Sequence, residues 1–378
     1  MKALSLLALV LLLAACAAAP SRQHDPIDTR AALSGTAILG EPVDIAQLPE
    51  HDLLTLAPEI REYLATIAPG ASPRQRLLAL IQAFESREFR VEYDADSTLS
   101  ATETYRQQRG NCLAFTLMMV AMARELGAEA YFNQVDVPPV WSHDEAQTFV
   151  VYRHINMVSE SARGRRVVDF NLDAYDPLYD QRKLSDTDAF AQFYSNRGIE
   201  LMKRNEREEA FRYLRKALQL RPEDSSLWSN LGALYSRYGY YDEAEQSYRQ
   251  ALALRPNNLV AISNLERLYR HNGRKELADY YAQRARYHRE HNPYYLFYQA
   301  RNAYEHGEYR RAKQQLRRAL WQYEDDHRFH FLMGLTNYRL GALEASKESF
   351  REAFSLANNP ATVNAYARKL DYLRRVQQ

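Results

Sequence analysis

The chain has 378 residues, of which 49 are Lys or Arg and 48 are Asp or Glu, so its formal net charge is only +1. This length predicts two or three domains with buried cores, and the balanced charge excludes a disordered acidic or basic tail protein. Residues 1–188 carry 17 basic and 26 acidic side chains (−9), whereas residues 189–378 carry 32 and 22 (+10). The change of sign predicts a domain boundary near residue 188, and neither half is charged enough to indicate nucleic-acid binding.

The first residues have the pattern of an export signal. Lys2 precedes an apolar run, Ala3 to Ala15, which is too short to span the ~30 Å hydrocarbon core of a bilayer. The run ends in Leu13-Ala14-Ala15-Cys16, which resembles the lipobox of bacterial lipoproteins. The resemblance implies removal of residues 1–15, acylation of Cys16 and anchoring at the periplasmic face of the outer membrane. An ordinary signal peptide with an incidental cysteine is the alternative. Residues 16–50, which contain several Pro and Gly, are expected to form a tether.

Residues 51–188 are expected to form an α+β domain. Apolar residues recur at helical spacing in 73–89 and again in 113–126, and Gly127 is well placed to end the second helix. Three β-rich stretches follow, bounded by turn residues, at Ala130–Val137, Thr148–Val158 and Arg165–Asn171.

Three residues of this domain have the chemistry of an activated thiol. Cys112 lies at the start of the second helix, where the macrodipole and free N–H groups favour a thiolate. His154 and Asp169 lie 15 residues apart on two strands joined by a turn at 163–165, so a hairpin brings them to adjacent strands. The imidazole can take the thiol proton, and the carboxylate can hold the imidazole in the productive tautomer. A buried cysteine that only fills space is the alternative for Cys112, and His143 is a competing histidine in a loop.

These residues carry a family resemblance. Arg109-Gly110-Asn111-Cys112 at a helix start, Leu126–Ala130 at its end, His154, and Val168-Asp169 resemble the transglutaminase-like core, a papain-related fold, over about residues 75–180. The resemblance implies that Cys112 is the nucleophile, His154 the general base and acid, and Asp169 the orienting carboxylate. Asn111 stands where eukaryotic transglutaminases have Gln, so the backbone N–H of Cys112 is the expected oxyanion donor, with Gln107 or Gln108 as a possible side-chain partner. No cofactor or metal is expected.

Residues 189–358 repeat with a period of 34 residues. Three series of small residues recur at this spacing. The first is Gly239, Gly273, Gly307 and Gly341, the second is Ala217, Ala251, Ala285, Ala319 and Ala353, and the third is Ala210, Ala244, Ala278, Ala312 and Ser346. Small residues at fixed positions in a 34-residue helix–turn–helix resemble the tetratricopeptide repeat (TPR). The resemblance implies an all-α solenoid of about five units, closed by a capping helix at 359–378, with a groove that binds a protein or peptide partner.

These features together predict a membrane-anchored thiol enzyme that acts on an amide or peptide bond. Two other functions are alternatives. One is a non-catalytic scaffold lipoprotein of the outer membrane, in which a degenerate transglutaminase-like domain serves recognition. The other is a structural lipoprotein of the cell envelope. The order Cys112, His154, Asp169 favours the enzyme. The sequence does not distinguish hydrolysis from transfer to an amine, and it does not identify the substrate.

Overall fold

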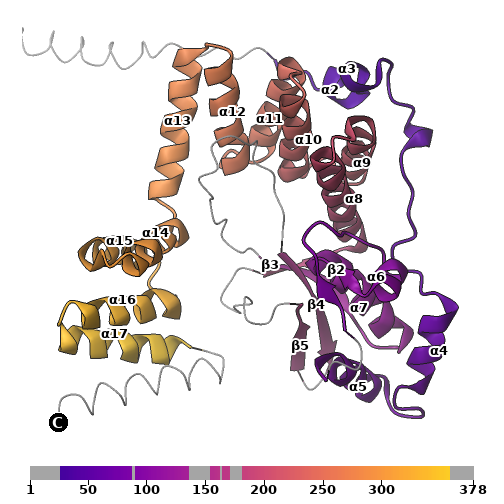
Figure 1. Cartoon of the computed structure of the whole chain (residues 1–378), viewed down its shortest axis with the longest axis horizontal. Coiled ribbons are helices and arrows are strands. Elements are labelled where there is room, and N and C mark those ends of the chain that lie inside the picture. The colour runs from indigo at the N-terminus through magenta and orange to yellow at the C-terminus, as the bar shows by residue number, and fades with distance from the viewer. Residues whose placement is uncertain (1–25, 87–89, 136–153, 162–163, 171–180, 358–378) are drawn as a thin grey trace, which may run out of the picture.

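A computed structural model describes residues 26–86, 90–135, 154–161, 164–170 and 181–357. It contains an N-terminal α+β region followed by an all-α region of paired helices, as predicted (Figure 1). Among these residues, no helix is both long and apolar enough to cross a membrane. The export signal with Cys16, the loop with His143 and the expected capping helix at 359–378 lie outside the described residues.

The N-terminal domain contains a four-stranded antiparallel sheet with the strand order β5-β4-β3-β6. Its strands are β3 (Tyr131–Val135), β4 (His154–Ser161), β5 (Gly164–Val168) and β6 (Gln181–Leu184). The first three fall in or overlap the predicted β-rich stretches. Strand β6 was not predicted, because its sequence is polar and only Leu184 is buried, as suits an edge strand that pairs with β3 alone.

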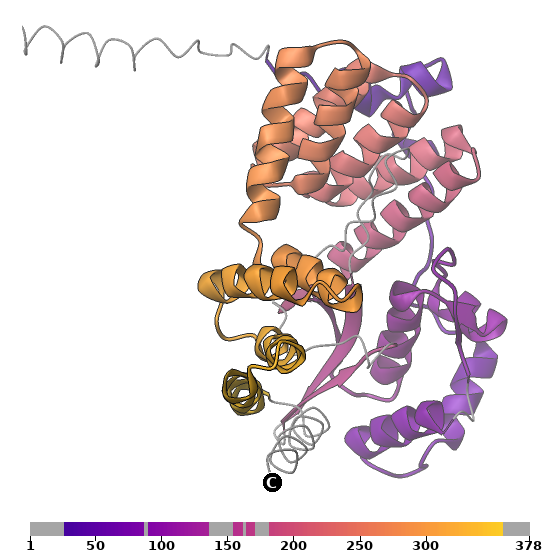
Figure 2. The ribbon, with the colours of Figure 1, turned by 60° about the vertical axis from the view of Figure 1, so that its left-hand side comes forward.

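Helices lie along one side of this sheet (Figure 2). They are α4 (Pro58–Thr66), α5 (Pro73–Glu85), α6 (Ala101–Gln107) and α7 (Cys112–Glu125), and a short parallel pair, β1 (Glu92–Tyr93) and β2 (Arg109–Gly110), leads into α7. Every residue of α7 from Leu113 to Ala123 is buried, and the helix packs on β3 and β4. This burial on all sides makes α7 the central helix of the domain.

Ten helices form five antiparallel pairs in the described part of the C-terminal half. They are α8 (Asp186–Lys203), α9 (Arg207–Leu220), α10 (Ser225–Arg237), α11 (Tyr241–Leu254), α12 (Leu259–His271), α13 (Lys275–Glu290), α14 (Pro293–Glu305), α15 (Tyr309–Gln322), α16 (His327–Arg339) and α17 (Leu343–Leu356). The repeated alanines are buried, and the repeated glycines adopt positive φ angles in the turns between the two helices of a pair. Burial therefore explains the repeated alanines, and the backbone conformation of the turns explains the repeated glycines.

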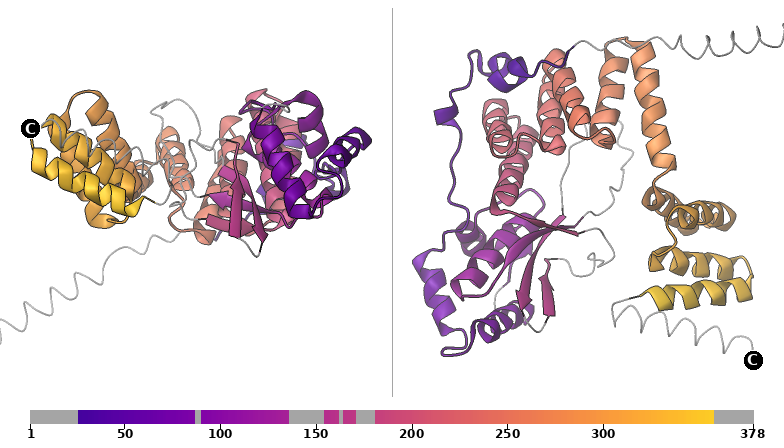
Figure 3. Two further views of the ribbon diagram at one scale, coloured as in Figure 1. Left: turned by 90° about the horizontal axis from the view of Figure 1, so that it is seen from below. Right: turned by 180° about the vertical axis from the view of Figure 1, so that it is seen from behind.

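The solenoid has a discontinuity between α13 and α14. Pro222 and Pro256 follow α9 and α11, and a proline disfavours helical geometry in the residue before it. Glu290 occupies the equivalent position in the third pair, so α13 continues to that residue. Among the described residues, the main hydrophobic core extends to Ala285, and α14, α15 and α16 share a separate core. The N-terminal domain and α14–α17 lie on opposite sides of the molecule (Figure 3).

Residues 30–50 differ from the expected tether because they pack against the solenoid. They form α2 (Arg30–Ser34), α3 (Thr36–Leu39) and the 3-10 turn η1 (Ile45–Gln47). Ala32 is fully buried, and its carbonyl accepts a hydrogen bond from the Tyr235 hydroxyl at 2.7 Å. A Cβ added to Gly35 would lie 2.2 Å from the Phe211 ring, so a glycine is needed for this close approach. The small residues of this segment therefore serve packing as well as chain flexibility.

Candidate functional site

Asn111 caps the N-terminus of α7 and fixes the position of Cys112. Its side-chain oxygen accepts the N–H of Ala114 at 3.0 Å, its own N–H donates to the Ser97 carbonyl at 3.0 Å, and its amide nitrogen donates to Thr98 Oγ1 at 2.6 Å. Within the part of the chain that the structure describes, the N–H groups of Cys112 and Leu113 have no acceptor. They are free to stabilise negative charge next to the thiol, as the sequence predicts.

Gly110 allows the segment before Cys112 to approach α7 closely. It pairs with Tyr93 in the β1–β2 ladder. A Cβ at this position would lie 2.8 Å from the Cβ of Ala114, which is too short for two carbon atoms. Glycine is therefore required for steric reasons, and its φ angle is not unusual.

His154 and Asp169 are in contact at one end of the β4–β5 hairpin. Nε2 of His154 lies 2.7 Å from Oδ2 of Asp169. The His154 side chain is 15% exposed and the Asp169 side chain is 0% exposed. The thiol of Cys112 is close enough to raise the pKa of His154 through a side-chain hydrogen bond and its charge. The structure thus brings Cys112, His154 and Asp169 together in the order of a thiol triad.

The charge of His154 is set by these two partners. Burial lowers the pKa of His154, but the hydrogen bonds and charges of Asp169 and Cys112 outweigh burial and raise the pKa to about 10. The imidazolium is therefore the main form of His154 at neutral pH.

Two buried asparagines lie behind Asp169, and sequence reasoning missed both. Nδ2 of Asn156 donates to Oδ2 of Asp169 at 2.9 Å, and Nδ2 of Asn133 donates to Oδ1 of Asn156 at 2.9 Å. Asn133 also donates to Oε1 of Gln181 at 3.2 Å. Asn156 follows His154 by two residues, so strand alternation places the two side chains on one face of β4. That spacing was the available signal, whereas nothing local identified Asn133.

Thr116 joins the helix of Cys112 to the strand of His154. Its hydroxyl lies 2.7 Å from the Cys112 carbonyl and 3.2 Å from the carbonyl of Ile155, the residue after His154. Because Thr116 is buried, this contact holds the first turn of α7 against the start of β4.

An aromatic side chain lies beside the thiol. Tyr93 is 55% exposed, and burial together with the charge of Cys112 raises the pKa of its hydroxyl. Its ring lies 5.5 Å from the ring of Phe170, which in turn lies 5.0 Å from that of Phe115 in the core. Aromatic side chains therefore support the Tyr93 ring, close enough to Cys112 for the charge of Cys112 to act on the Tyr93 hydroxyl.

The two glutamines that were candidate oxyanion donors are exposed. Gln107 ends α6, and its side-chain oxygen accepts a hydrogen bond from Arg109 Nε at 3.2 Å. Gln108 has a left-handed backbone conformation with φ 51°, and its carbonyl accepts the N–H of Glu92 at 2.7 Å. The N–H groups of Cys112 and Leu113, in contrast, have no acceptor among the described residues and directly flank the thiol in the sequence.

A separate cavity lies at the other end of α7. It has a volume of about 260 Å³, and its lining includes Pro73, Gly127 and Arg165 but no residue of the triad. Within the described residues there is also no group of three or more His, Cys, Asp or Glu side chains that could hold a metal ion.

Comparison with known proteins identifies the repeats. Models of the tetratricopeptide repeat match residues 191–224, 225–258 and 298–360. The C-terminal half therefore contains tetratricopeptide repeats, which confirms the prediction from the 34-residue period. A search of the curated proteins finds no match to this chain.

Solved structures are similar to the chain over about half of its length. A MamA fragment from Desulfovibrio magneticus is 19% identical, covers 46% of this chain and 96% of its own, and has a TM-score of 0.26. PilF of Pseudomonas aeruginosa is 17% identical, with coverage of 50% and 94% and a TM-score of 0.27. YrrB, described as a TPR protein with an unusual peptide-binding site, is 23% identical, with coverage of 48% and 92% and a TM-score of 0.25.

Proposed function

We propose that the N-terminal domain is a transglutaminase-like thiol enzyme that acts on an amide bond, and that the repeats recruit a protein partner or substrate. The observation that carries the proposal is the contact of His154 with both Asp169 and Cys112, with the thiol at the N-terminus of α7. A helix N-terminus, a histidine and a buried carboxylate are the three components that activate a cysteine nucleophile.

The proposed reaction proceeds through an acyl-enzyme. The Cys112 thiolate attacks the amide carbonyl, and the N–H groups of Cys112 and Leu113 bind the oxyanion that forms. Protonated His154 then gives its proton to the leaving amine as the C–N bond breaks, which leaves a thioester on Cys112. Neutral His154 takes a proton from water or from a second amine, whose attack on the thioester releases an acid or a new amide. Asp169 orients the imidazole throughout.

An amide-bearing, thiol-reactive probe tests this proposal. We expect covalent labelling of Cys112, loss of labelling in Cys112→Ser, and strong reduction in His154→Ala because the imidazolium is removed. Mapping the labelled peptide by mass spectrometry separates Cys112 from Cys16. Labelling of Cys112 at the rate of a free thiol, unchanged in His154→Ala, would refute catalysis and favour the scaffold function.

For the repeats, we propose an acidic segment of a partner protein as the ligand of α15. This helix carries five Arg or Lys and no acidic residue. A groove of about 540 Å³ runs along it, and its lining includes Arg310, Lys313, Arg317, Trp321 and Leu340. Trp321 is 85% exposed. Cations around an exposed aromatic ring suit carboxylates with an apolar anchor residue, and large exposed aromatic groups are common at protein interfaces.

The partner proposal can be tested with a defined peptide. A Glu-rich peptide with a single Leu is titrated while the fluorescence of Trp321 is followed, with Trp321→Phe to identify the signal. We expect Arg310→Ala with Arg317→Ala to weaken binding about tenfold, whereas Arg237→Ala on α10, away from the groove, leaves binding unchanged. No binding of the peptide, or binding of anionic phospholipid vesicles instead, would overturn the proposal.

The same proposal includes a lipid anchor on Cys16 that holds the enzyme at the periplasmic face of the outer membrane. Its support is the lipobox-like sequence Leu13-Ala14-Ala15-Cys16 alone. Residues 30–50, which pack on the solenoid, leave the segment between Cys16 and Arg30 as the link to the membrane.

A further inference from the structure

We propose that Glu200, on the first helix of the solenoid, is a positioning residue for Cys112 and acts through Thr98 and Asn111. This inference rests on the proposed thiol chemistry, because it concerns the orientation of the nucleophile. This role makes the repeat region part of the scaffold of the active site, so a movement of α8 would change the position of the Cys112 thiol.

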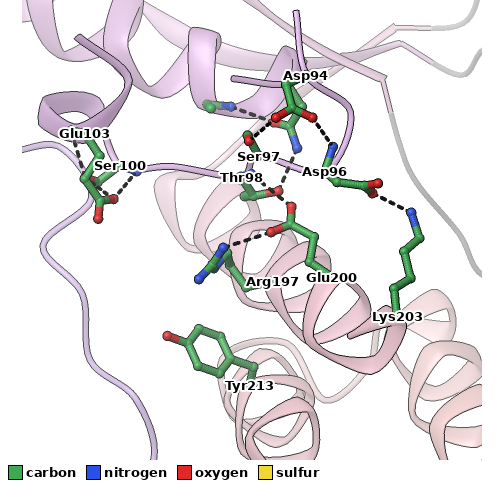
Figure 4. A network of polar contacts seen from close by, with 12 residues as sticks. Asp94, Asp96, Ser97, Thr98, Ser100, Glu103, Arg197, Glu200, Lys203 and Tyr213 are labelled. Atoms are coloured by element: carbon green, nitrogen blue, oxygen red, sulfur yellow. Dashed lines mark hydrogen bonds and ion pairs between the residues drawn. The ribbon is translucent and has the colours of Figure 1, made fainter. Parts of the chain in front are cut away.

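The first link joins the two halves of the chain. Oε1 of Glu200 accepts the backbone N–H of Thr98 at 2.9 Å, and Oε2 accepts a hydrogen bond from Arg197 at 2.9 Å (Figure 4). The Glu200 side chain is 1% exposed. Thr98 lies in the loop 94–100 between β1 and α6, and it is separated from Glu200 by 102 residues of sequence. A helix of the repeats thus holds a loop of the N-terminal domain through a buried carboxylate.

The second link joins this loop to the N-terminus of α7. Thr98 Oγ1 accepts the side-chain amide of Asn111 at 2.6 Å, and the carbonyl of Ser97 accepts the Asn111 N–H at 3.0 Å. Asn111 in turn caps α7 through the N–H of Ala114. The side-chain amide and the backbone N–H of the cap residue therefore both bind the loop that Glu200 holds, and Cys112 is the next residue after the cap.

Burying a carboxylate between two domains is energetically unfavourable. Burial disfavours its charged form and raises the pKa of Glu200, although the hydrogen bonds from Thr98 and Arg197 oppose that shift. A buried charge contributes little net stability but fixes geometry, since its hydrogen bonds are strong and directional. The nearby ion pair between Lys203 and Asp96 crosses the same interface but is exposed, so it contributes little. The role of Glu200 is therefore to fix the position of Thr98 rather than to add stability.

Two substitutions break the chain of contacts at different points. Glu200→Ala removes the acceptor of the Thr98 N–H, and Thr98→Val removes the acceptor of the Asn111 amide together with the hydrogen bond of the Thr98 hydroxyl to Glu200, while the Thr98 N–H keeps its bond to Glu200. Glu200→Gln keeps an oxygen for Thr98 and serves as the rescue variant. Lys203→Ala removes the exposed ion pair with Asp96 at the same interface and leaves the hydrogen bonds of Thr98 and Asn111 in place, so it is the matched control.

The rate of alkylation of Cys112 by iodoacetamide, measured on its peptide in the folded full-length protein at neutral pH, reports how reactive and accessible the thiol is at this position. We expect Glu200→Ala and Thr98→Val to slow it about fivefold, the effect of a weakened helix cap of ordinary strength, and Glu200→Gln to restore most of the rate. Lys203→Ala should match the wild type. Circular dichroism and thermal melting establish that each variant is folded, and Thr98→Val and Glu200→Gln keep the test decisive if Glu200→Ala does not fold.

The outcomes separate this inference from the proposed function. If His154→Ala slows alkylation but Glu200→Ala and Thr98→Val do not, the positioning role of Glu200 is wrong and the thiol chemistry stands. If Lys203→Ala slows alkylation as much as Glu200→Ala, the interface acts as a whole and the specific path is wrong. If His154→Ala has no effect, the proposed function itself fails.

Discussion

Replacing Asn156 by Leu tests whether the buried amides behind the triad hold it in place. Asn156 is fully buried and donates to Asp169 at 2.9 Å while it accepts from Asn133 at 2.9 Å. Leucine has the same branched arrangement of side-chain heavy atoms, so the substitution removes both hydrogen bonds and keeps the shape of the side chain. Asp169 keeps its hydrogen bond with His154, and Asn133 keeps its hydrogen bond to Gln181.

The expected cost follows from the two groups that each lose a partner. A buried polar group that loses its hydrogen bond costs about 1–3 kcal/mol, and a carboxylate lies at the upper end of that range. For Asp169 and Asn133 together, partly offset by burial of the leucine, we expect a loss of about 2–4 kcal/mol in the free energy of unfolding. That is a large part of the ~5–15 kcal/mol that stabilises a typical domain. Alkylation of Cys112 should fall as well, but less than in Asp169→Asn, since Asn156 acts through Asp169.

Urea denaturation followed by far-ultraviolet circular dichroism gives the stability, and iodoacetamide kinetics below the transition give the thiol reactivity. Ser159→Ala is the matched control, because Ser159 lies on the opposite face of β4 and its side chain has no hydrogen bond among the described residues. Loss of stability without any change in alkylation would show that the amides only support the fold. Wild-type behaviour in both measurements would refute the reasoning entirely.

Three further predictions concern the charge, the backbone and the anchor of this site. Because the folded protein raises the pKa of His154 from 6.5 to about 10, the stability from its protonated form is present in full below about pH 6.5 and lost as pH rises toward 10. The difference in unfolding free energy between the wild type and His154→Gln should therefore shrink between about pH 6 and pH 9.5, and a difference that grows would contradict this sign. Gly110→Ala should cost about 1–3 kcal/mol and slow alkylation, since its Cβ would lie 2.8 Å from that of Ala114; an unchanged melting temperature would argue against the steric reason. Cys16→Ser should leave the chain uncleaved and unacylated in cell fractionation and mass spectrometry, whereas a mature wild-type protein without acyl chains would disprove the anchor.

The sequence by itself determined the features that depend on neighbours along the chain. The 34-residue period identified the repeats, because each pair of helices packs through residues such as Ala210 and Ala217 that are close in sequence. The cap at Asn111 and the start of α7 at Cys112 are equally local. The proximity of His154 and Asp169 could be predicted because their strands follow each other closely in the sequence, and a short hairpin leaves few possible registers.

Tertiary structure alone decided the contacts between distant segments. Asn133 and Asn156 meet because β3 pairs with β4, and Thr98 meets Glu200 across 102 residues. The contact of Ala32 with Tyr235, which turns the expected tether into a packed segment, spans 203 residues. Hydrophobic periodicity shows which face of an element is buried but not which element covers it. A buried asparagine or glutamate therefore looks like a surface residue in the sequence, and only the completed packing shows its hydrogen-bond partner.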